Sequence, residues 1–183
     1  EIIQIMYMDI AIPDDCFALA PKIKQTDKFE LAVMGKDPLW TLLYPFRINR
    51  PNVHTFGVYQ DDGTIEAMFG CCSSMDNEKK GTAWWLSTEE PFANYRYMRH
   101  QKRVFTWLAS HYSYLWNVAT EEQEKTLRWV KYMGFTISDR PLLVKRVKMK
   151  YFYIEPKGFN GEPIDDVCGP RWRTLNQNST DNS

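Results

Sequence analysis

The chain has 183 residues, 44% of them hydrophobic and 15% aromatic, which excludes an intrinsically disordered chain and is enough for one domain with a buried core. Lysine plus arginine and aspartate plus glutamate number 23 each, so the net charge gives no overall attraction to nucleic acid or to an anionic membrane. No apolar run approaches the roughly 20 residues that cross a bilayer, and the start "EIIQIMYMDIAIPDD" lacks the features of a signal peptide. We therefore expect no membrane association.

The N-terminal third predicts one strand followed by short helices. Their expected ranges are 2–8, 14–21, 26–34 and 38–44. Asp14 or Asp15 is expected to cap the first helix, and Thr26 with Asp27 the second, because these side chains accept hydrogen bonds from free helix N–H groups. Pro45 is expected to end the third.

The middle of the chain predicts three antiparallel strands and then alternating helices and strands. Their expected ranges are 53–59, 64–72, 82–88, helix 95–112, 114–119, helix 120–134, 135–137 and 142–154. Asp62 and Gly63 favour a tight two-residue hairpin turn. Thr120 is expected to cap the second long helix, with acidic residues in its first turn. This order indicates a mixed α/β fold with one central sheet flanked by helices.

The final residues differ in composition from the rest. The segment "EPKGFNGEPIDDVCGPRWRTLNQNSTDNS" contains three prolines, three glycines and a polar end, which predicts an irregular, extended C-terminal extension. We therefore divide the chain into a domain at 1–154 and an extension at 155–183. An ordered extension of this composition would need something to hold it in place.

The cysteines and histidines give no catalytic or metal-binding pattern. Cys16, Cys71, Cys72 and Cys168 include no C-x-x-C pair, and neighbouring residues of a strand point to opposite faces, so we expect buried, reduced thiols. The three histidines are scattered, and no Cys, His or Asp spacing indicates a metal site.

Several short motifs in a fixed order resemble a known family. They are Gly81, Trp84 to Leu86, Thr88, Arg99, Trp116-Asn117-Val118, Arg128-Trp129-Val130 and Gly134-Phe135. Over roughly residues 27 to 137, this order resembles the GNAT family of acetyl-CoA-dependent acyltransferases. More narrowly, it resembles the acetyltransferase-like "internal virion protein A" family of T7-like podoviruses, a bacteriophage branch. The resemblance implies a GNAT-like mixed central sheet flanked by helices.

The resemblance also implies where an acyl-CoA would be held, if one is bound. Backbone amides around Trp85, Leu86 and Ser87 would hydrogen-bond the thioester carbonyl. Arg96 and Arg99, at the start of the following helix with Lys102 and Arg103 close behind, would bind phosphates by charge. The alternative is that these cations form an ordinary solvated helix face.

Two elements that the family uses are missing from the sequence. The segment "STEEPFANYRYMRHQ" has no glycines to cradle a pyrophosphate. The tyrosine that often protonates the leaving thiolate is replaced by Val130, while Tyr132 lies about 200° around the helix. Gln123 stands where an asparagine is common. We assign no catalytic residue and expect no resident cofactor, or acetyl-CoA if the chain is an enzyme.

Two functions follow from the resemblance. The first is a phage protein that uses this fold as a binding or structural module, with a degenerate acyl-CoA site and phage structural proteins as partners, in the host cytoplasm during assembly or in the virion. The second is an active N-acetyltransferase that acts on a protein or a small amine. A third, weaker idea is nucleic-acid binding by the alternating residues Arg146, Lys148 and Lys150, which also suit a charged edge strand that discourages aggregation.

Overall fold

The computed structural model describes residues 6–50, 53–89, 95–159 and 161–180; within α4 and α6, the side chains of residues 95, 96, 179 and 180 are not described. The elements of the first half are β1 (Met6–Ile10), α1 (Pro13–Leu19), the 3-10 turn η1 (Ala20–Lys22), α2 (Gln25–Val33), α3 (Pro38–Arg47), β2 (His54–Gln60), β3 (Ile65–Ser73) and β4 (Lys80–Ser87). Those of the second half are α4 (Tyr95–Ala109), β5 (Tyr114–Thr120), α5 (Glu124–Tyr132), β6 (Thr136–Ile137), β7 (Leu142–Val144), β8 (Val147–Ile154) and α6 (Pro170–Thr180).

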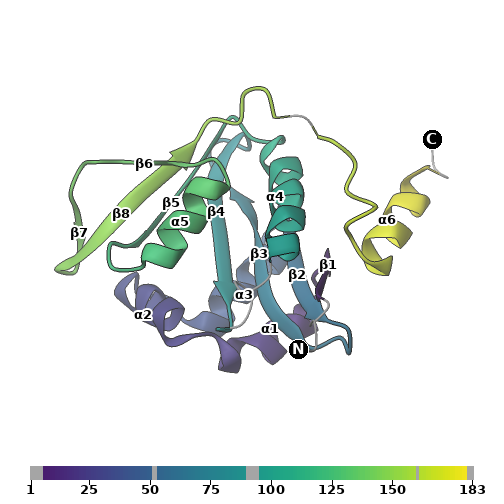
Figure 1. Cartoon of the computed structure of the whole chain (residues 1–183), viewed down its shortest axis with the longest axis horizontal. Coiled ribbons are helices and arrows are strands. Elements are labelled where there is room, and N and C mark those ends of the chain that lie inside the picture. The colour runs from purple at the N-terminus through teal and green to yellow at the C-terminus, as the bar shows by residue number, and fades with distance from the viewer. Residues whose placement is uncertain (1–5, 51–52, 90–94, 160, 181–183) are drawn as a thin grey trace.

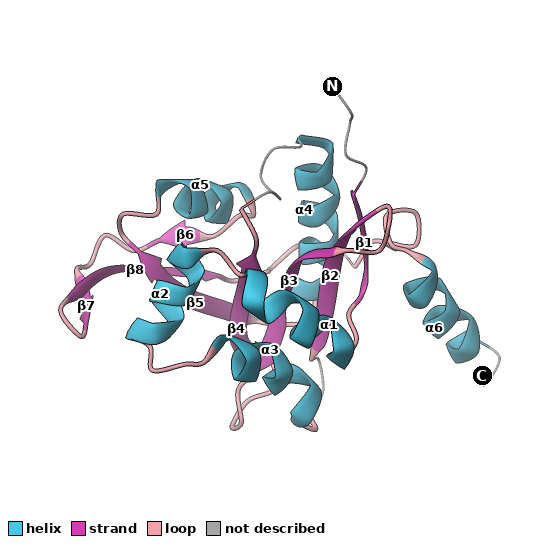
Figure 2. Cartoon of the chain, turned by 90° about the horizontal axis from the view of Figure 1, so that it is seen from below, coloured by secondary structure: helices cyan, strands magenta, loops and turns pink. Residues whose placement is uncertain are grey.

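All strands of the described residues belong to one eight-stranded sheet, in the order β1-β2-β3-β4-β5-β8-β6, with β7 also paired to β8. Every strand pair is antiparallel except β4 with β5, which is parallel. Helices α1, α2 and α3 cover one face of the sheet, and α4 and α5 cover the other (Figures 1 and 2). The predicted mixed α/β fold with one central sheet is thus confirmed.

Each face of the sheet buries its own apolar cluster. On the side of α4 and α5, residues such as Phe105, Leu108 and Val130 pack against the strands. On the side of α1 to α3, Leu19 and Leu42 do the same. The central strand β3 is buried along its whole length, because it contributes alternate side chains to both clusters. The four cysteines are free and buried, as predicted.

The β2–β3 hairpin is present, but its turn differs from the one predicted. Gly63 N–H donates to the Gln60 carbonyl at 2.9 Å, and Gln60 N–H donates to the Thr64 carbonyl at 2.8 Å. The loop therefore has three residues rather than two, with Gly63 at a φ of +85°. A glycine in the left-handed region at the third position is typical of three-residue hairpins.

Two of the first three helices have boundaries that the sequence did not predict. Helix α1 begins at Pro13, so Asp14 and Asp15 lie inside it rather than capping it, and the Asp15 carboxylate accepts from the Ile12 N–H at 2.9 Å. Helix α3 continues through Pro45 to Arg47. Proline removes one helical hydrogen bond, but Pro45 is buried in the sheet-facing side of the helix, and this packing offsets the loss.

The predicted caps Asp27 and Thr120 make tertiary contacts instead. Helix α2 begins at Gln25, so Asp27 lies in its first turn, and its carboxylate accepts from the Ser87 N–H of β4 at 3.1 Å. Thr120 is the last residue of β5, and Gln123 is the N-cap residue of α5 without a side-chain cap bond. The Asp27 side chain therefore bonds to β4, and the Thr120 hydroxyl donates to Glu30 of α2. Neither side chain caps its predicted helix.

The segment predicted as one long strand is a hairpin. Strands β7 and β8 are joined by Lys145 and Arg146, which have φ angles of 47° and 68°. Two consecutive left-handed residues form the tight turn that matches strand twist. Arg146 therefore does not share a strand face with Lys148 and Lys150, and Lys150 pairs with Glu121 at 3.5 Å. The expected basic ladder was wrong.

The C-terminal extension is partly helical, in contrast to the extended segment predicted. Helix α6 lies beside β1 (Figure 1), next to a parallel bridge between Met8 and Cys168. Trp172 and Ile164 are buried in the apolar cluster shared with α4 and α5. The chain's own first strand thus supplies the support that such a segment needs. The domain boundary at 154 stays a prediction.

Candidate functional site

A cleft opens at the centre of the sheet, where two neighbouring strands diverge. Strands β4 and β5 pair over only three positions, from Lys80 with Tyr114 to Thr82 with Trp116. Both strands then continue for several residues without pairing to each other. The antiparallel pairs on either side hold each strand in its own half of the sheet, and the V-shaped gap between them forms the cleft.

Asn117 lies at the point where the strands separate. Its side-chain amide donates to the Ala83 carbonyl of β4 at 2.7 Å, and its side-chain oxygen accepts from the Val118 N–H at 2.8 Å. The side chain thus replaces backbone bonds that β4 and β5 lose on diverging, since buried backbone groups need partners. The sequence places this residue within the aromatic-Asn-x-Val motif.

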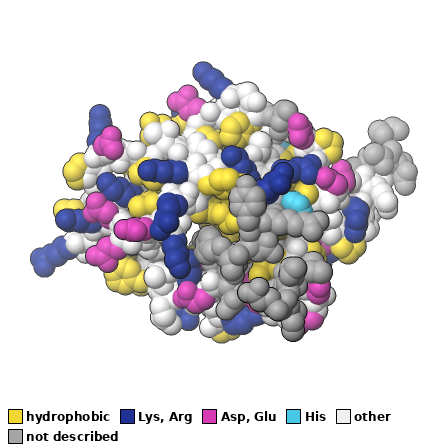
Figure 3. Space-filling model, viewed as in Figure 1, with side chains coloured by type: hydrophobic (Ala, Val, Ile, Leu, Met, Phe, Trp, Pro, Cys, Tyr) yellow, Lys and Arg dark blue, Asp and Glu magenta, His cyan; other side chains and the backbone are white. Residues whose placement is uncertain are grey.

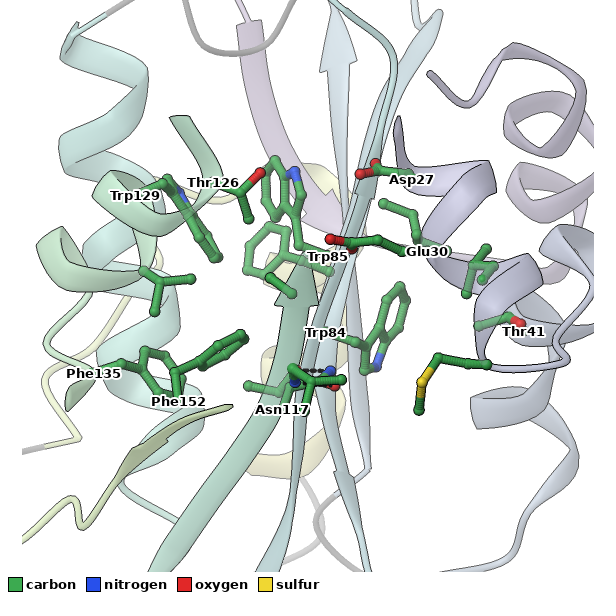
Figure 4. A pocket seen from close by; sticks show the side chains of 18 of the residues that line it. Asp27, Glu30, Thr41, Trp84, Trp85, Asn117, Thr126, Trp129, Phe135 and Phe152 are labelled. Atoms are coloured by element: carbon green, nitrogen blue, oxygen red, sulfur yellow. Dashed lines mark hydrogen bonds between the residues drawn. The ribbon is translucent and has the colours of Figure 1, made fainter. Parts of the chain in front are cut away.

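Inside the cleft is a small cavity of about 130 Å³. Figure 4 shows aromatic side chains of both helices and strands turned into it. Trp85 of β4 lies against Trp129 of α5, with ring centroids 5.3 Å apart, and against Phe69 at 5.0 Å. Ligand pockets commonly have volumes of about 300 to 1,000 Å³, so the cavity is smaller than a typical small-molecule site.

The passage between α4 and α5 is closed by a side-chain contact. The Trp129 indole N–H donates to the Gln101 side-chain oxygen at 3.2 Å. Gln101 comes from α4 and is fully buried, so this bond joins α4 to Trp129, a residue that lines the cavity. Trp85 and Trp129 thus narrow the cavity on this side of the diverging strands, and Gln101 holds Trp129 in place.

On the opposite side, Asp27 of α2 is hydrogen-bonded to β4. Its carboxylate accepts from the Ser87 N–H, while the Ser87 carbonyl accepts from the Lys24 N–H at 2.9 Å. Lys24 also places its ammonium 3.7 Å from the Asp27 carboxylate. Burial raises the pKa of Asp27 to about 6, in spite of the nearby lysine, because an ionised carboxylate is disfavoured away from water.

Glu30, one turn further along α2, is hydrogen-bonded to the other strand. Its carboxylate accepts from the Thr120 N–H at 2.6 Å, the Thr120 hydroxyl at 3.0 Å and the Gln123 side chain at 2.8 Å. Burial raises the pKa of Glu30. Helix α2 therefore bridges the open end of the V, with one carboxylate on β4 and one on β5. Both carboxylates line the cavity.

The predicted backbone site around residues 85 to 87 is only partly available. The β3–β4 register and the Thr88 N–H bond to Glu66 show that even-numbered residues of β4 direct their backbone toward β3. Leu86 therefore faces β3 with its backbone, whereas Trp85 and Ser87 face the cleft. The Ser87 N–H is already bonded to Asp27. Trp85 and Leu86 line the cavity with their side chains.

Three of the predicted basic residues, Arg99, Lys102 and Arg103, lie outside the lining of the cavity. Arg99 lines a separate pocket of about 270 Å³ with Lys102, Arg103, Thr106, Tyr132 and Glu162. Arg103 forms an ion pair with Asp166 at 2.6 Å. The Arg96 side chain lies outside the described residues. On the face with α4 and α5, acidic side chains are interspersed among the basic ones (Figure 3), so this face is not uniformly positive.

Val130 and Tyr132 of α5 lie in different pockets. Val130 is fully buried and lines the cavity, so an apolar side chain occupies the position predicted for a proton donor. Tyr132 lies in the other pocket, where the Lys102 ammonium sits 4.7 Å from the centre of its ring. In the described part of the chain, no three His, Cys, Asp or Glu side chains gather as metal ligands, and no helix is long and apolar enough to cross a membrane.

Sequence reasoning missed Asp27 and Glu30 as residues of the cleft. They are three positions apart, which places them on one face of a helix, next to the buried Leu31. Asp27 also lies four residues before Leu31, and this spacing places the carboxylate on the buried side of the helix. Because Asp27 follows a threonine at a helix start, it was interpreted as a cap.

Comparison with solved structures identifies the architecture. A GCN5-related N-acetyltransferase from Kribbella flavida superposes with a TM-score of 0.62 at 12% identity, over 82% of this chain and 97% of that one. A Vibrio cholerae spermidine N-acetyltransferase in complex with CoA and spermine gives 0.62 at 10% identity, over 84% and 97%. A GNAT-family acetyltransferase from Streptococcus pneumoniae gives 0.55 at 9% identity, over 82% and 99%.

The chain has the GNAT fold. The diverging β4 and β5, with α4 and α5 on one face, form its central cleft. No protein-family model matches the sequence, and neither does any curated protein. At identities of 9 to 12%, the likeness shows the fold alone, so function has to be argued from the residues in this chain's own cleft.

Proposed function

We propose that this chain is a binding module built on the GNAT fold, with an acyl-CoA cleft closed by its own side chains. The observation that carries the proposal is the ring contact of Trp85 with Trp129 in the cavity, together with the hydrogen bond from Trp129 of α5 to Gln101 of α4. A cofactor arm that entered between α4 and α5 would have to break this contact. A second observation is that Val130 lines the cavity. Its side chain stands where a proton donor is expected, and valine cannot transfer a proton.

The proposal extends to a bacteriophage particle or its assembly, with phage structural proteins as partners. Its support is the resemblance of the motifs from Gly81 to Phe135 to the internal virion protein A family. Quantitative mass spectrometry of purified particles and of assembly intermediates tests this part. Detection at a fixed copy number relative to a structural protein is the expected result, and absence from both fractions would overturn it.

Calorimetric titration of acetyl-CoA and of CoA into the full chain tests the closed cleft. The expected result is no binding heat and no thermal shift at millimolar ligand. Trp129→Ala removes the side chain that closes the passage, so a gain of binding in this variant alone identifies Trp129 as the obstruction. Trp107→Ala, which shortens a half-buried tryptophan of α4 that does not line the cavity, is the matched control. Micromolar binding by the parent would contradict the proposal.

An active N-acetyltransferase is the second candidate, and Asp27 is the observation that favours it. A carboxylate with a pKa raised to about 6 in the cleft is suited to accept a proton from an amine near neutral pH. The test is acetyl transfer to spermine and to lysine peptides as a function of pH. For an active enzyme, Asp27→Asn is expected to abolish the fall in acetyl-transfer rate at acidic pH. The Arg96→Glu, Arg99→Glu double variant is expected to raise the Kd for acetyl-CoA.

A further inference from the structure

A second concave surface lies on the face of the sheet that carries α3. We call it the aromatic groove, of about 670 Å³, and its lining includes Trp40, Tyr44, Trp84 and Trp116. Trp40 is 56% exposed, Tyr44 46% and Trp116 37%. Large aromatic side chains are usually well buried in a soluble protein, so three exposed rings around one groove indicate a recognition surface.

The aromatic surface continues from the groove along β5 and β8. Trp116 stacks on Tyr151 with ring centroids 5.7 Å apart. Tyr151 stacks on Tyr153 at 6.0 Å, and Tyr153 stacks on Tyr114 at 6.1 Å. These residues project from the same side of the two strands. The rings thus form a row that begins in the groove and runs out along the sheet.

The floor of the groove contains a hydrogen-bond donor that the chain does not satisfy. The Trp84 indole N–H is buried and has no hydrogen-bond partner among the described residues. Trp84 lines both the groove and the cleft cavity, and Figure 4 shows it beside Asn117. Because buried donors in folded proteins are almost always paired, this N–H marks a strained position beneath the groove.

The charges around the groove are mainly positive, although the chain as a whole is neutral. Lys36 lines the groove. Arg47 lies 4.0 Å from the centre of the Trp40 ring, and Arg50 lies 5.8 Å from that of Tyr44. Among the described lining residues the acid is Asp37, and its carboxylate already accepts from the N–H of Trp40 at the start of α3.

We infer that the aromatic groove and the row of rings beyond it bind single-stranded nucleic acid. Exposed flat rings offer stacking platforms to unpaired bases, and cations beside them balance the phosphates, which is the combination that sequence-independent single-strand binders use. This site differs from the Arg146, Lys148 and Lys150 surface expected from sequence, and it does not depend on whether the cleft binds CoA.

Fluorescence anisotropy with labelled 12-nucleotide oligo(dT) and oligo(U) tests the inference on the full chain. Trp40→Ala and Trp116→Ala are each expected to weaken binding by about 5-fold or more, because each removes a stacking platform. Phe17→Ala is the matched control, since Phe17 is a comparably exposed ring on α1. Trp116→Tyr is expected to retain most of the affinity, which separates stacking from a general structural effect.

Salt dependence tests the role of the cations. Arg47→Glu is expected to weaken binding and to lower the slope of log Kd against log salt by about 0.7 or more, because it removes at least one phosphate contact. Arg128→Glu on α5, far from the groove in sequence and highly exposed, is expected to leave the slope unchanged. Circular dichroism and thermal unfolding confirm that each variant is folded.

Four results would each overturn the inference. They are no binding of either oligonucleotide by the parent at low salt, equal affinity for duplex and single strand, equal losses in the groove variants and their controls, and competition by poly-glutamate at the same charge concentration. The last result would identify an acidic protein as the partner of this surface. A CoA titration that contradicts the closed cleft leaves these outcomes unaffected.

Discussion

Asp27 combines a structural and an electrostatic role in one side chain. It accepts the N–H of Ser87, so it occupies a backbone amide that faces the cleft. It is also buried, which raises its pKa from 3.8 to about 6. Because the folded state binds the proton more tightly than the unfolded state, this group stabilises the fold below about pH 4 and loses that contribution as the pH rises to about 6.

The pH dependence of stability should therefore change when Asp27 is replaced. Asp27→Asn keeps an oxygen for the Ser87 N–H but cannot ionise. Relative to the parent, we expect this variant to gain roughly 2 kcal/mol of stability as the pH rises from 4 to 6, and roughly 3 kcal/mol in all for a shift of about two pKa units. Urea unfolding at several pH values measures this. Asp14→Asn, an exposed acid on α1, is the control, and parallel stability curves for Asp27→Asn and the parent would contradict the prediction.

Asn117 should be important for stability because it replaces backbone bonds at the divergence of β4 and β5. Asn117→Ala leaves the Ala83 carbonyl and the Val118 N–H without their side-chain partner. We expect a loss of about 1 to 3 kcal/mol in the free energy of unfolding. Chemical denaturation measures it, with the exposed Asn49→Ala as the control. A loss equal to that of the control would show that water replaces both bonds.

At the scale of single residues, the sequence predicts which helix or strand a residue belongs to better than it predicts the residue's contacts. Val130 lies on the predicted helix and is buried in the cavity, whereas its place at a proton donor's position rests on the family resemblance and stays a prediction. The roles of Asp27 and Glu30 depend on Ser87 and Thr120, which are distant along the chain. Such contacts are not encoded in local periodicity, so the same aspartate was interpreted as a helix cap.

At the scale of elements, the N-terminal end of helix α6 is held by a carboxylate of strand β1. The buried Asp9 of β1 accepts from the N–H groups of Arg171 and Trp172 at 3.0 and 2.8 Å. Free N–H groups at a helix start need such an acceptor, and the helix dipole favours its negative charge. Arg171 adds a bond to the Asp15 carboxylate at 3.2 Å, which ties α6 to α1 as well.

Removing this carboxylate should loosen α6 before the rest of the chain. Asp9→Ala leaves two N–H groups without their acceptor and is expected to cost about 1 to 3 kcal/mol. Hydrogen exchange should rise in residues 170–178 while β3 stays protected. Asp37→Ala, which removes the N-cap of α3, is the matched control and should affect α3 instead. Unchanged exchange in α6 would show that apolar packing alone holds it.

The elements themselves were largely predictable, whereas their ends were not. Strand alternation and helical periodicity located the strands and the long helices because these signals are local. The third residue of the Gly63 turn and the Lys145–Arg146 turn were missed. Neither a glycine-free tight turn nor a bulged loop has a strong sequence signature, and the side chains at several helix starts have tertiary partners.

For the whole molecule, the parallel contact of β4 with β5 determines where a site can form. The sheet is antiparallel elsewhere, and it divides where this one short parallel pair ends. Element order in the sequence predicted the mixed central sheet, and the motifs that resemble the GNAT family implied its GNAT-like form. It could not predict that the cleft is filled by tryptophans, because packing across a cavity depends on three-dimensional placement of side chains that are far apart in the chain.

The C-terminal segment is the largest feature that composition failed to predict, and it should be essential to stability. Trp172 is buried and its ring lies 4.9 Å from Trp107 and 5.6 Å from Phe56. Proline, glycine and polar residues indicated an extended segment because composition does not register a single large anchor. We expect Trp172→Ala to cost about 3 to 5 kcal/mol, or roughly 10 °C in Tm.

Differential scanning calorimetry of the full chain, Trp172→Ala and a chain ending at residue 154 measures this dependence. If the extension is part of the same cooperative unit, the full chain unfolds in one transition, and both changes lower its Tm. Leu175→Ala, on the exposed side of α6, should change Tm by only a degree or two. A truncated chain with the Tm of the parent would instead make 1–154 an autonomous domain, because burial of Trp172 would then add nothing to the stability of the sheet.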